Sequence, residues 1–229
     1  MLAHLFGPPD EWPSADLIAF SDEFDTPLAL AAYRSGVFPM PLHLGGFEQQ
    51  MGWWSPVHRG ILPLDGVRVT RSLRQSAKKY RTTVDAAFDE VIRRCGDPRR
   101  PGGWIDPAIV DVYTEMFGAG LVHSVETWDA AGRLVGGLYG VSLSGMFAGE
   151  SMFHDDQFGR DASKVALLRL ADILRDGHDR LLDVQWRTGH LASLGAIEIP
   201  RDVYLRRLDA ALGQPPVHWP GPDPRPEEA

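Results

Sequence analysis

Glu150 is the residue whose surroundings most suggest chemistry. It ends a glycine-dense apolar stretch over residues 134–149, and its near neighbours are Phe147, Met152 and Phe153. A carboxylate among such residues is costly to bury unless a cationic or hydrogen-bonding group meets it. Glycine-dense strands mark a bulge or a close approach by another backbone or a ligand. The stretch predicts either two strands that open into a pocket at Glu150, or a tight hairpin with Glu150 capping the following helix.

Asp183 and Gln185 form a second candidate pair, in a predicted buried strand over residues 181–185. Side chains two positions apart on a strand point to the same face of the sheet. We therefore expect a carboxylate and an amide side by side, although Asp183 could instead cap the next element.

A basic stretch covers residues 67–81, where six Lys or Arg residues occur without an acidic one. In a helix, Arg71, Arg74 and Lys78 would share one face, with Lys79 beside them. Such a helix is either a solvated surface element or a site for an anionic partner. The net charge of −8 argues against a protein that coats nucleic acid.

The composition is that of a globular protein, with 44% apolar and 24% charged residues among 229. No run approaches the ~18 apolar residues of a membrane span, and the first 30 residues do not resemble a secretory signal. One cysteine, Cys95, fits a reducing compartment, so we predict a cytoplasmic protein without a membrane partner. Cys95 has the spacing of a core residue. No metal-ligand spacing and no P-loop is evident, which predicts neither a metal nor a cofactor.

The elements that must position these residues can be read from periodicity and caps. Residues 38–41 are predicted to form a stiff turn. From residue 60 we expect a strand at 67–70, a helix at 72–79, a strand at 81–84, two helices, three strands, a helix at 161–176, the strand at 181–185 and a final helix at 202–212. This order predicts an α+β layered fold with a mainly antiparallel sheet flanked by helices. We place a small N-terminal domain at residues 1–60, a larger domain at 61–212 and a Pro-rich, disordered or surface-lying tail at 213–229.

Several strings, in this order and spacing, resemble the leucyl/phenylalanyl-tRNA–protein transferase family over about residues 28–208. They are AYR (32–34), GVFP (36–39), WWSP (53–56), TRSLR (70–74), GWI (103–105), HSVE (123–126), VGGLYGV (135–141), GESMF (149–153), ASK (162–164), DVQ (183–185), SLGA (193–196) and IPR (199–201). Any one string is weak evidence, but all of them in register are strong evidence.

The resemblance implies an enzyme that moves leucine or phenylalanine from aminoacyl-tRNA to proteins beginning with Arg or Lys, which marks them for degradation. It also implies a catalytic domain with the fold of the acetyl-CoA-dependent N-acetyltransferases (GNAT), after a small N-terminal domain. We expect a monomer that uses Leu-tRNA or Phe-tRNA.

The resemblance also implies roles for residues. Asp183 would orient the attacking amine and act as base or as electrostatic anchor, and Gln185 would position the reacting groups. Glu150 would pair with the acceptor's N-terminal residue. The basic helix would hold tRNA phosphates. The amino-acid pocket would be formed by Leu138, Met152, Leu167, Leu170 and Leu174.

Trp104 would stack near the terminal adenosine. A second position that would contact the adenosine, usually a tryptophan in the family, is Met40 in this sequence. Methionine packs less rigidly on a base, which puts the affinity for adenosine in question. Three alternatives remain open: an acyl-CoA-dependent N-acyltransferase on the same fold, an aminoacyl-tRNA-dependent enzyme acting on a cell-wall peptide, and a tRNA-binding protein without catalysis.

Overall fold

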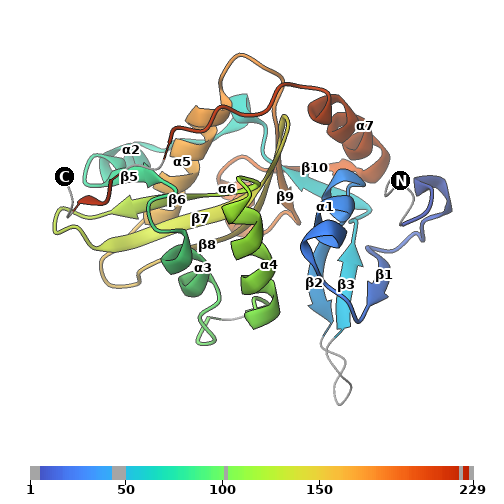
Figure 1. Ribbon diagram of the computed structural model, residues 1–229. Coiled ribbons are helices and arrows are strands. Elements are labelled where there is room, and N and C mark those ends of the chain that lie inside the picture. Colours follow the sequence, from blue (N-terminus) through green and yellow to red (C-terminus); the bar gives the residue numbers. More distant parts are fainter. Residues whose placement is uncertain (1–5, 43–49, 101–102, 222–223, 227–229) are drawn as a thin grey trace.

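The computed structural model describes residues 6–42, 50–100, 103–221 and 224–226, which form two β-sheets with helices packed around them (Figure 1). The smaller sheet, in the order β1-β3-β2, is formed by β1 (Leu17–Ser21), β2 (Phe38–Leu42) and β3 (Gln50–Trp54), with α1 (Thr26–Arg34) beside it. Both strand pairs are antiparallel.

The larger sheet has seven strands among the described residues. In spatial order they are β10 (Ile197–Pro200), β4 (His58–Ile61), β9 (Leu181–Gln185), β8 (Met146–His154), β7 (Leu134–Leu143), β6 (Val122–Trp128) and β5 (Arg81–Val84). All neighbours pair antiparallel except β8 and β9, which are parallel. The fold is therefore α+β with a mainly antiparallel sheet, as predicted.

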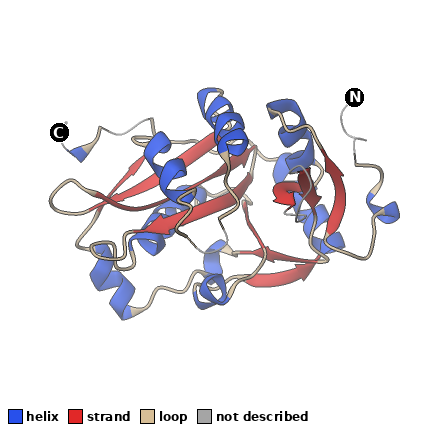
Figure 2. Ribbon diagram, turned by 90° about the horizontal axis from the view of Figure 1, so that it is seen from below, coloured by secondary structure: helices blue, strands red, loops and turns tan. Residues whose placement is uncertain are grey.

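Helices cover both faces of the larger sheet (Figure 2). They are α2 (Arg71–Ala77), α3 (Phe88–Cys95), α4 (Pro107–Gly118), α5 (Ala162–Leu174), α6 (Gly189–Ser193) and α7 (Arg201–Leu212), with short 3-10 turns at Pro9–Glu11 and Leu64–Gly66. Alternation along β7 separates the two faces, because Leu138 packs in the cluster that includes α5 whereas Tyr139 packs with α3 and α4. Every residue of β7 is buried, so this strand is covered by helices on both faces of the sheet.

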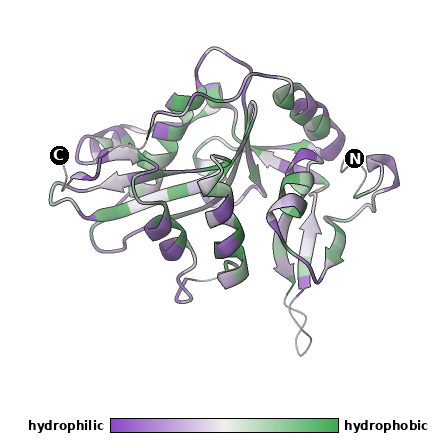
Figure 3. Ribbon diagram, in the orientation of Figure 1, coloured by the Kyte–Doolittle hydropathy of each residue, from purple (hydrophilic) through white to green (hydrophobic). Residues whose placement is uncertain are grey.

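The helices at the surface are amphipathic (Figure 3). Helix α4 carries hydrophilic and hydrophobic residues on different sides, and its buried residues include Ile109, Tyr113 and Met116. Asp106 caps it by accepting a hydrogen bond from the Ile109 amide, and Pro107 occupies its first turn.

Two local predictions were wrong. Residues 38–41 form strand β2 rather than a turn, because an edge strand tolerates Pro39 and Pro41, which lack an amide hydrogen. Residues 67–70 are extended but pair with no strand in the described part of the chain, and the strand that begins this section is β4. Thr70 instead caps α2 through its side chain.

The glycines of the β7–β8 hairpin have the roles that the sequence indicated. The register shifts between Tyr139 and Gly140, and a Cβ on Gly140 would lie 2.2 Å from the Ala148 carbonyl oxygen. At Gly136 a Cβ would lie 2.5 Å from that of Ala162, so this glycine lets the first turn of α5 approach the sheet.

The parallel pairing of β8 with β9 is short, and this opens the sheet. It runs from Met146 opposite Leu181 to Ala148 opposite Asp183, and the strands do not pair beyond that point. The residues that follow, Glu150 on β8 and Gln185 on β9, therefore face a gap in the sheet.

The described part of the C-terminal tail packs against the molecule, running past α5 toward β5 (Figure 1). Val217 is buried, and the Trp219 ring stacks on His123 at a centroid distance of 4.1 Å. The Trp219 indole nitrogen donates to the Ser142 hydroxyl at 3.1 Å. Within the part of the chain that the structure describes, no helix is long and apolar enough to cross a membrane.

Candidate active site

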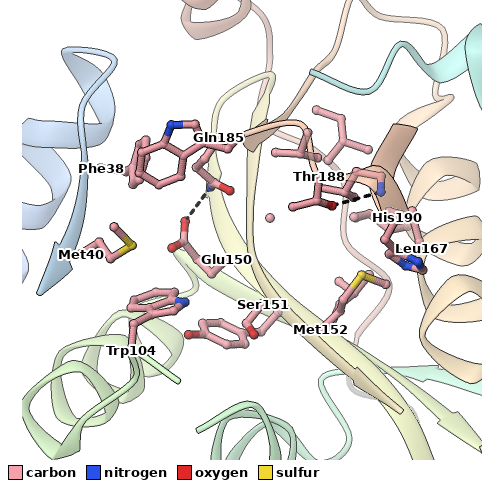
Figure 4. A pocket seen from close by; sticks show the side chains of 18 of the residues that line it. Phe38, Met40, Trp104, Glu150, Ser151, Met152, Leu167, Gln185, Thr188 and His190 are labelled. Atoms are coloured by element: carbon pink, nitrogen blue, oxygen red, sulfur yellow. Dashed lines mark hydrogen bonds between the residues drawn. The ribbon is translucent and has the colours of Figure 1, made fainter. Parts of the chain in front are cut away.

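A cavity of about 350 Å³ opens where β8 and β9 separate (Figure 4). Glu150 and Gln185 lie between two groups of side chains. On one side is the aromatic end, formed by Phe38, Met40, Trp104 and Trp186. On the other is the aliphatic end, whose residues pack in one apolar cluster: Leu138, Met152, Leu167, Leu170, Leu182, Val184 and Leu191. Thr188 and His190 lie at its margin.

The aliphatic end contains four of the five residues predicted to form an amino-acid pocket. Leu174 is the exception, since it is fully buried and does not line the cavity. It lies one helical turn beyond Leu170, at the end of α5, and packs within the same buried apolar cluster. Sequence analysis missed Leu182 and Val184, which alternate with Asp183 along β9 and could have been assigned to the opposite face by that alternation.

Glu150 is held by neutral hydrogen-bond donors. The Gln185 side-chain amide donates to Glu150 Oε1 at 3.3 Å, and the Tyr113 hydroxyl donates to Oε2 at 3.1 Å. The pKa of Glu150 is raised to about 8: burial is the largest cause and the charge of nearby Asp183 acts in the same direction, while hydrogen bonds from Tyr33 and Tyr113 and the charge of Arg59 lower the pKa. At neutral pH this carboxyl is therefore mostly protonated. It does not cap the helix that follows, so the pocket interpretation of this stretch is the correct one.

Two tyrosines support Glu150 from the N-terminal side. The hydroxyls of Tyr33 on α1 and Tyr113 on α4 lie 2.5 Å apart, and both side chains are buried. Burial is the main cause that raises the pKa of each phenol well above its usual value, and the charge of Glu150 adds to it. Both residues were missed in the sequence, because their contacts with Glu150 come from distant parts of the chain.

Asp183 does not share a face with Gln185, contrary to the sequence prediction. It is fully buried, does not line the cavity, and is bound by Arg59 through Nε to Oδ1 at 2.9 Å and through Nη2 to Oδ2 at 2.6 Å. The Tyr204 hydroxyl donates to Oδ2 at 2.9 Å. Sequence analysis did not identify Arg59 or Tyr204 as partners of this carboxylate.

The backbone of Gln185 explains the difference. Its φ is +54°, in the left-handed region, so the regular alternation of β9 ends at this residue. The Gln185 amide nitrogen donates to Asp183 Oδ1 at 2.9 Å, which holds the turned backbone. The Gln185 side chain consequently enters the cavity and reaches Glu150 (Figure 4).

The two residues predicted to contact an adenosine, Trp104 and Met40, both line the aromatic end. The predicted phosphate-binding residues lie outside the cavity. Arg71, Arg74, Lys78 and Lys79 are all exposed on or just after α2, and none of them forms an ion pair within the described residues. The Ser76 hydroxyl, which donates to Asp161 at 3.0 Å, ties this helix to the start of α5.

Two family models match the chain. The leucyl/phenylalanyl-tRNA protein transferase model matches residues 61–209, and the model of the N-terminal domain of the same transferase matches residues 22–57. The chain belongs to this family. Members of the leucyl/phenylalanyl-tRNA–protein transferase family are enzymes, so the cavity is the candidate active site of a transferase.

Curated relatives carry the same family name. The leucyl/phenylalanyl-tRNA–protein transferase of Rhizorhabdus wittichii is 48% identical over 193 residues, covering 82% of this chain and 75% of that protein. The transferase of Thiobacillus denitrificans is 44% identical over 222 residues, covering 94% of this chain and 93% of that protein.

Among solved structures, "The structure of L-PGS from Bacillus licheniformis" is similar with a TM-score of 0.39 at 8% identity, covering 76% of this chain and 57% of that chain. This TM-score is too low to establish a shared fold, so the acetyltransferase-like fold stays a prediction. Among the residues that the structure describes, no group of three His, Cys, Asp or Glu side chains is arranged to hold a metal ion.

Proposed function

We propose that this transferase moves leucine, or phenylalanine, from its charged tRNA to the α-amine of proteins whose first residue is Arg or Lys, marking those proteins for degradation. The single observation that supports this proposal is that the aliphatic end and the aromatic end of one cavity meet at the Glu150 carboxyl and the Gln185 amide. The aliphatic end suits the side chain of leucine or phenylalanine. The aromatic end suits a flat base, and Glu150 suits a cationic acceptor.

The reaction is the aminolysis of an ester. The α-amine nitrogen attacks the aminoacyl carbonyl carbon, the bond to the ribose oxygen breaks, and the proton lost by the amine ends on that oxygen. The amine attacks only when neutral, and its reference pKa is about 7.7–8.0. Because only a modest deprotonation is needed, holding the amine and the ester in line supplies much of the acceleration.

Gln185 positions the amine. Its side-chain nitrogen donates to Glu150, which leaves its carbonyl oxygen as an acceptor facing the cavity. That oxygen can accept a hydrogen bond from the α-amine and aim the nitrogen lone pair toward the ester carbonyl. The left-handed backbone at Gln185 is what brings this group to the cleft.

Asp183 acts as a positioning residue. Both of its oxygens are engaged, by Arg59, Tyr204 and the Gln185 amide, and it is fully buried. It therefore contributes by fixing Gln185 rather than as a base that takes the amine proton. These contacts support an anchor rather than a base as the role of Asp183 in this proposal.

Glu150 receives the positive charge of the acceptor. With a pKa of about 8 it is mostly neutral when the site is empty. A guanidinium or ammonium group placed beside it favours the ionised form, so acceptor binding releases a proton near neutral pH.

Several finer features belong to the same proposal. The exposed cations of α2 contact tRNA phosphates, which gives affinity without sequence readout. The division into domains near residue 60 and at 212, the acetyltransferase-like fold, the monomeric state and the cytoplasmic location remain predictions. The short parallel pairing of β8 and β9, with a cleft beyond it, is compatible with such a fold.

The decisive experiment mixes the purified protein with labelled Leu-tRNA and a peptide that begins with Arg. We expect label in this peptide and none in the same peptide with an acetylated N-terminus. The Gln185→Ala variant should lose most of the transfer, whereas Gln157→Ala, on an exposed loop, should retain it. Transfer from leucyl-CoA, transfer to a cell-wall peptide instead, or no transfer from any charged tRNA would refute the proposal.

A further inference from the structure

Trp186 is an unassigned residue of the aromatic end. It directly follows Gln185 at the end of β9, is only partly buried, and lines the cavity. A tryptophan used for packing alone is expected to cover its ring with core residues. A partly exposed ring at a cavity wall instead offers a flat apolar surface to a ligand.

The orientation of the Trp186 ring is fixed by other aromatic rings. It meets Phe38 at a centroid distance of 4.9 Å and an interplanar angle of 86°, and Trp54 at 5.7 Å and 70°. Such edge-to-face contacts are favourable and hold both planes at a defined angle.

A hydrogen bond to the N-terminal segment fixes the indole further. The Trp186 Nε1 atom donates to Asp16 Oδ2 at 3.0 Å. Asp16 is itself anchored, because its Oδ1 accepts from the Val57 amide at 2.9 Å and its carbonyl oxygen accepts from the Ser55 amide at 2.8 Å. The ring is thus held without a ligand, as a preorganised wall requires.

Trp54 places Trp186 on the same wall as Met40. The Trp54 indole nitrogen donates to the Met40 carbonyl oxygen at 3.0 Å, and its ring contacts that of Trp186. Trp104 comes from the segment before α4 and faces this wall across the aromatic end (Figure 4). A flat group that enters here would lie between Trp104 and the wall that carries Met40 and Trp186.

We propose that Trp186 is a second aromatic partner of the donor's terminal adenine, opposite Trp104, and that Asp16 is the residue that positions it. This inference rests on the proposed function and deepens it. It also accounts for adenosine binding without a tryptophan at position 40. The thioether of Met40 is not flat, but Trp186 supplies a flat ring on the same wall. Phe38 completes the contact by fixing the ring plane.

The test compares Trp186→Leu with Trp186→Phe, which keeps a flat ring, and with Trp219→Leu as a matched control. Trp219 is also partly buried and hydrogen-bonded but lies outside the cavity. The probe is 3′-(leucylamino)adenosine, a hydrolysis-resistant analogue of the donor end, with leucinamide as the probe that lacks the base. Binding is measured by calorimetry, and the melting temperature of each variant is recorded.

Trp186→Leu should weaken binding of the adenosine analogue by about 5- to 150-fold, the range expected for one base–aromatic stack. Leucinamide binding should not change, Trp186→Phe should restore part of the loss, and Trp219→Leu should behave as the native protein. Asp16→Asn should weaken analogue binding less than Trp186→Leu does, and should raise the KM for the charged tRNA more than it lowers kcat.

Two outcomes would overturn the inference about Trp186. Neither would affect the proposed function, provided that the native protein transfers leucine. One is unchanged analogue binding in Trp186→Leu. The other is a raised KM for the Arg peptide alone, which would assign the ring to the acceptor cation. By contrast, analogue binding without any leucine transfer by the native protein would refute the proposed function, not the role of Trp186.

Discussion

Two carboxyl groups on neighbouring strands of one site have opposite environments. Asp183 on β9 is paired with Arg59, contacts Tyr204 and is sealed from solvent. Glu150 on β8 forms no ion pair within the described residues, accepts hydrogen bonds from the Gln185 amide and the Tyr113 hydroxyl, reaches the cavity, and has its pKa raised to about 8. We infer from this difference that the carboxyl with a direct countercharge supports the site, and we propose that the one without an ion-pair partner receives the cationic substrate.

Removing the guanidinium from the sealed pair should have the largest effect. Arg59→Leu leaves the Asp183 charge buried without a partner, so the free energy of unfolding should fall by about 3–5 kcal/mol. Urea denaturation measures this free energy of unfolding. Arg206→Leu, which breaks an exposed pair with Asp202, should change it by less than about 0.5 kcal/mol. Equal effects of the two variants would contradict the contrast drawn between sealed and open carboxyls.

Gln185 links the two carboxyls, and its loss should separate activity from stability. Gln185→Gly removes the amide that we propose positions the amine, and should lower kcat by about 10²–10³-fold, as for other preorganised groups. Because glycine adopts a φ of +54° without strain, the same variant should keep its stability or gain about 1 kcal/mol. A variant that is both inactive and strongly destabilised would argue for a purely structural residue.

Glu150→Gln should raise the KM for an Arg peptide by about 10- to 100-fold, because a hydrogen bond between charged groups contributes about 1.5–3 kcal/mol. With the native protein, this KM should fall as the pH rises toward 8, since deprotonated Glu150 binds the cation. The variant should lose that pH dependence. A pH-independent KM in the native protein would show that Glu150 is already ionised in the free site.

The same variant should also change the pH profile of stability. The folded pKa of Glu150 lies above the ordinary value of 4.5, so this carboxyl favours the folded state fully below pH 4.5. That contribution is lost as the pH rises to about 8. Glu150→Gln should therefore gain stability relative to the native protein across this window, as thermal melts at pH 5 and pH 8.5 would detect.

The smallest effect is expected from a phenol. Tyr113→Phe removes the hydrogen bond to Glu150 Oε2, which stabilises the ionised form, so the pH at which the acceptor KM falls should move upward. Tyr139→Phe is the control, because the Tyr139 hydroxyl is buried without a hydrogen-bond partner in the described chain. An identical pH profile in both variants would remove Tyr113 from the acceptor site.

Much of the fold could be predicted because its signals are local. The cap at Asp106, the apolar stripe of α5 and the glycines at the β7–β8 bulge each act on their near neighbours in sequence. Strand β2 was missed because Pro39 and Pro41 indicate a turn unless the strand is known to lie at a sheet edge.

The site was harder to predict because its contacts are long-range. Arg59 and Asp183 are separated by 124 positions, and nothing near either residue indicates the pair. The left-handed Gln185 backbone is also invisible to pattern analysis, since non-glycine residues seldom adopt it and period-two alternation assumes that they do not. Leu174 was misassigned because a helical stripe does not show where a cavity ends.

The early separation of β8 and β9 after Ala148 and Asp183 has one more consequence. Beyond that point each strand still pairs on its outer side, β8 with β7 and β9 with β4, so the sheet itself holds the backbone on both sides of the gap. Donor choice would then evolve by exchanging the residues that project into this gap, and a redesigned amino-acid preference would require new side chains but no new backbone.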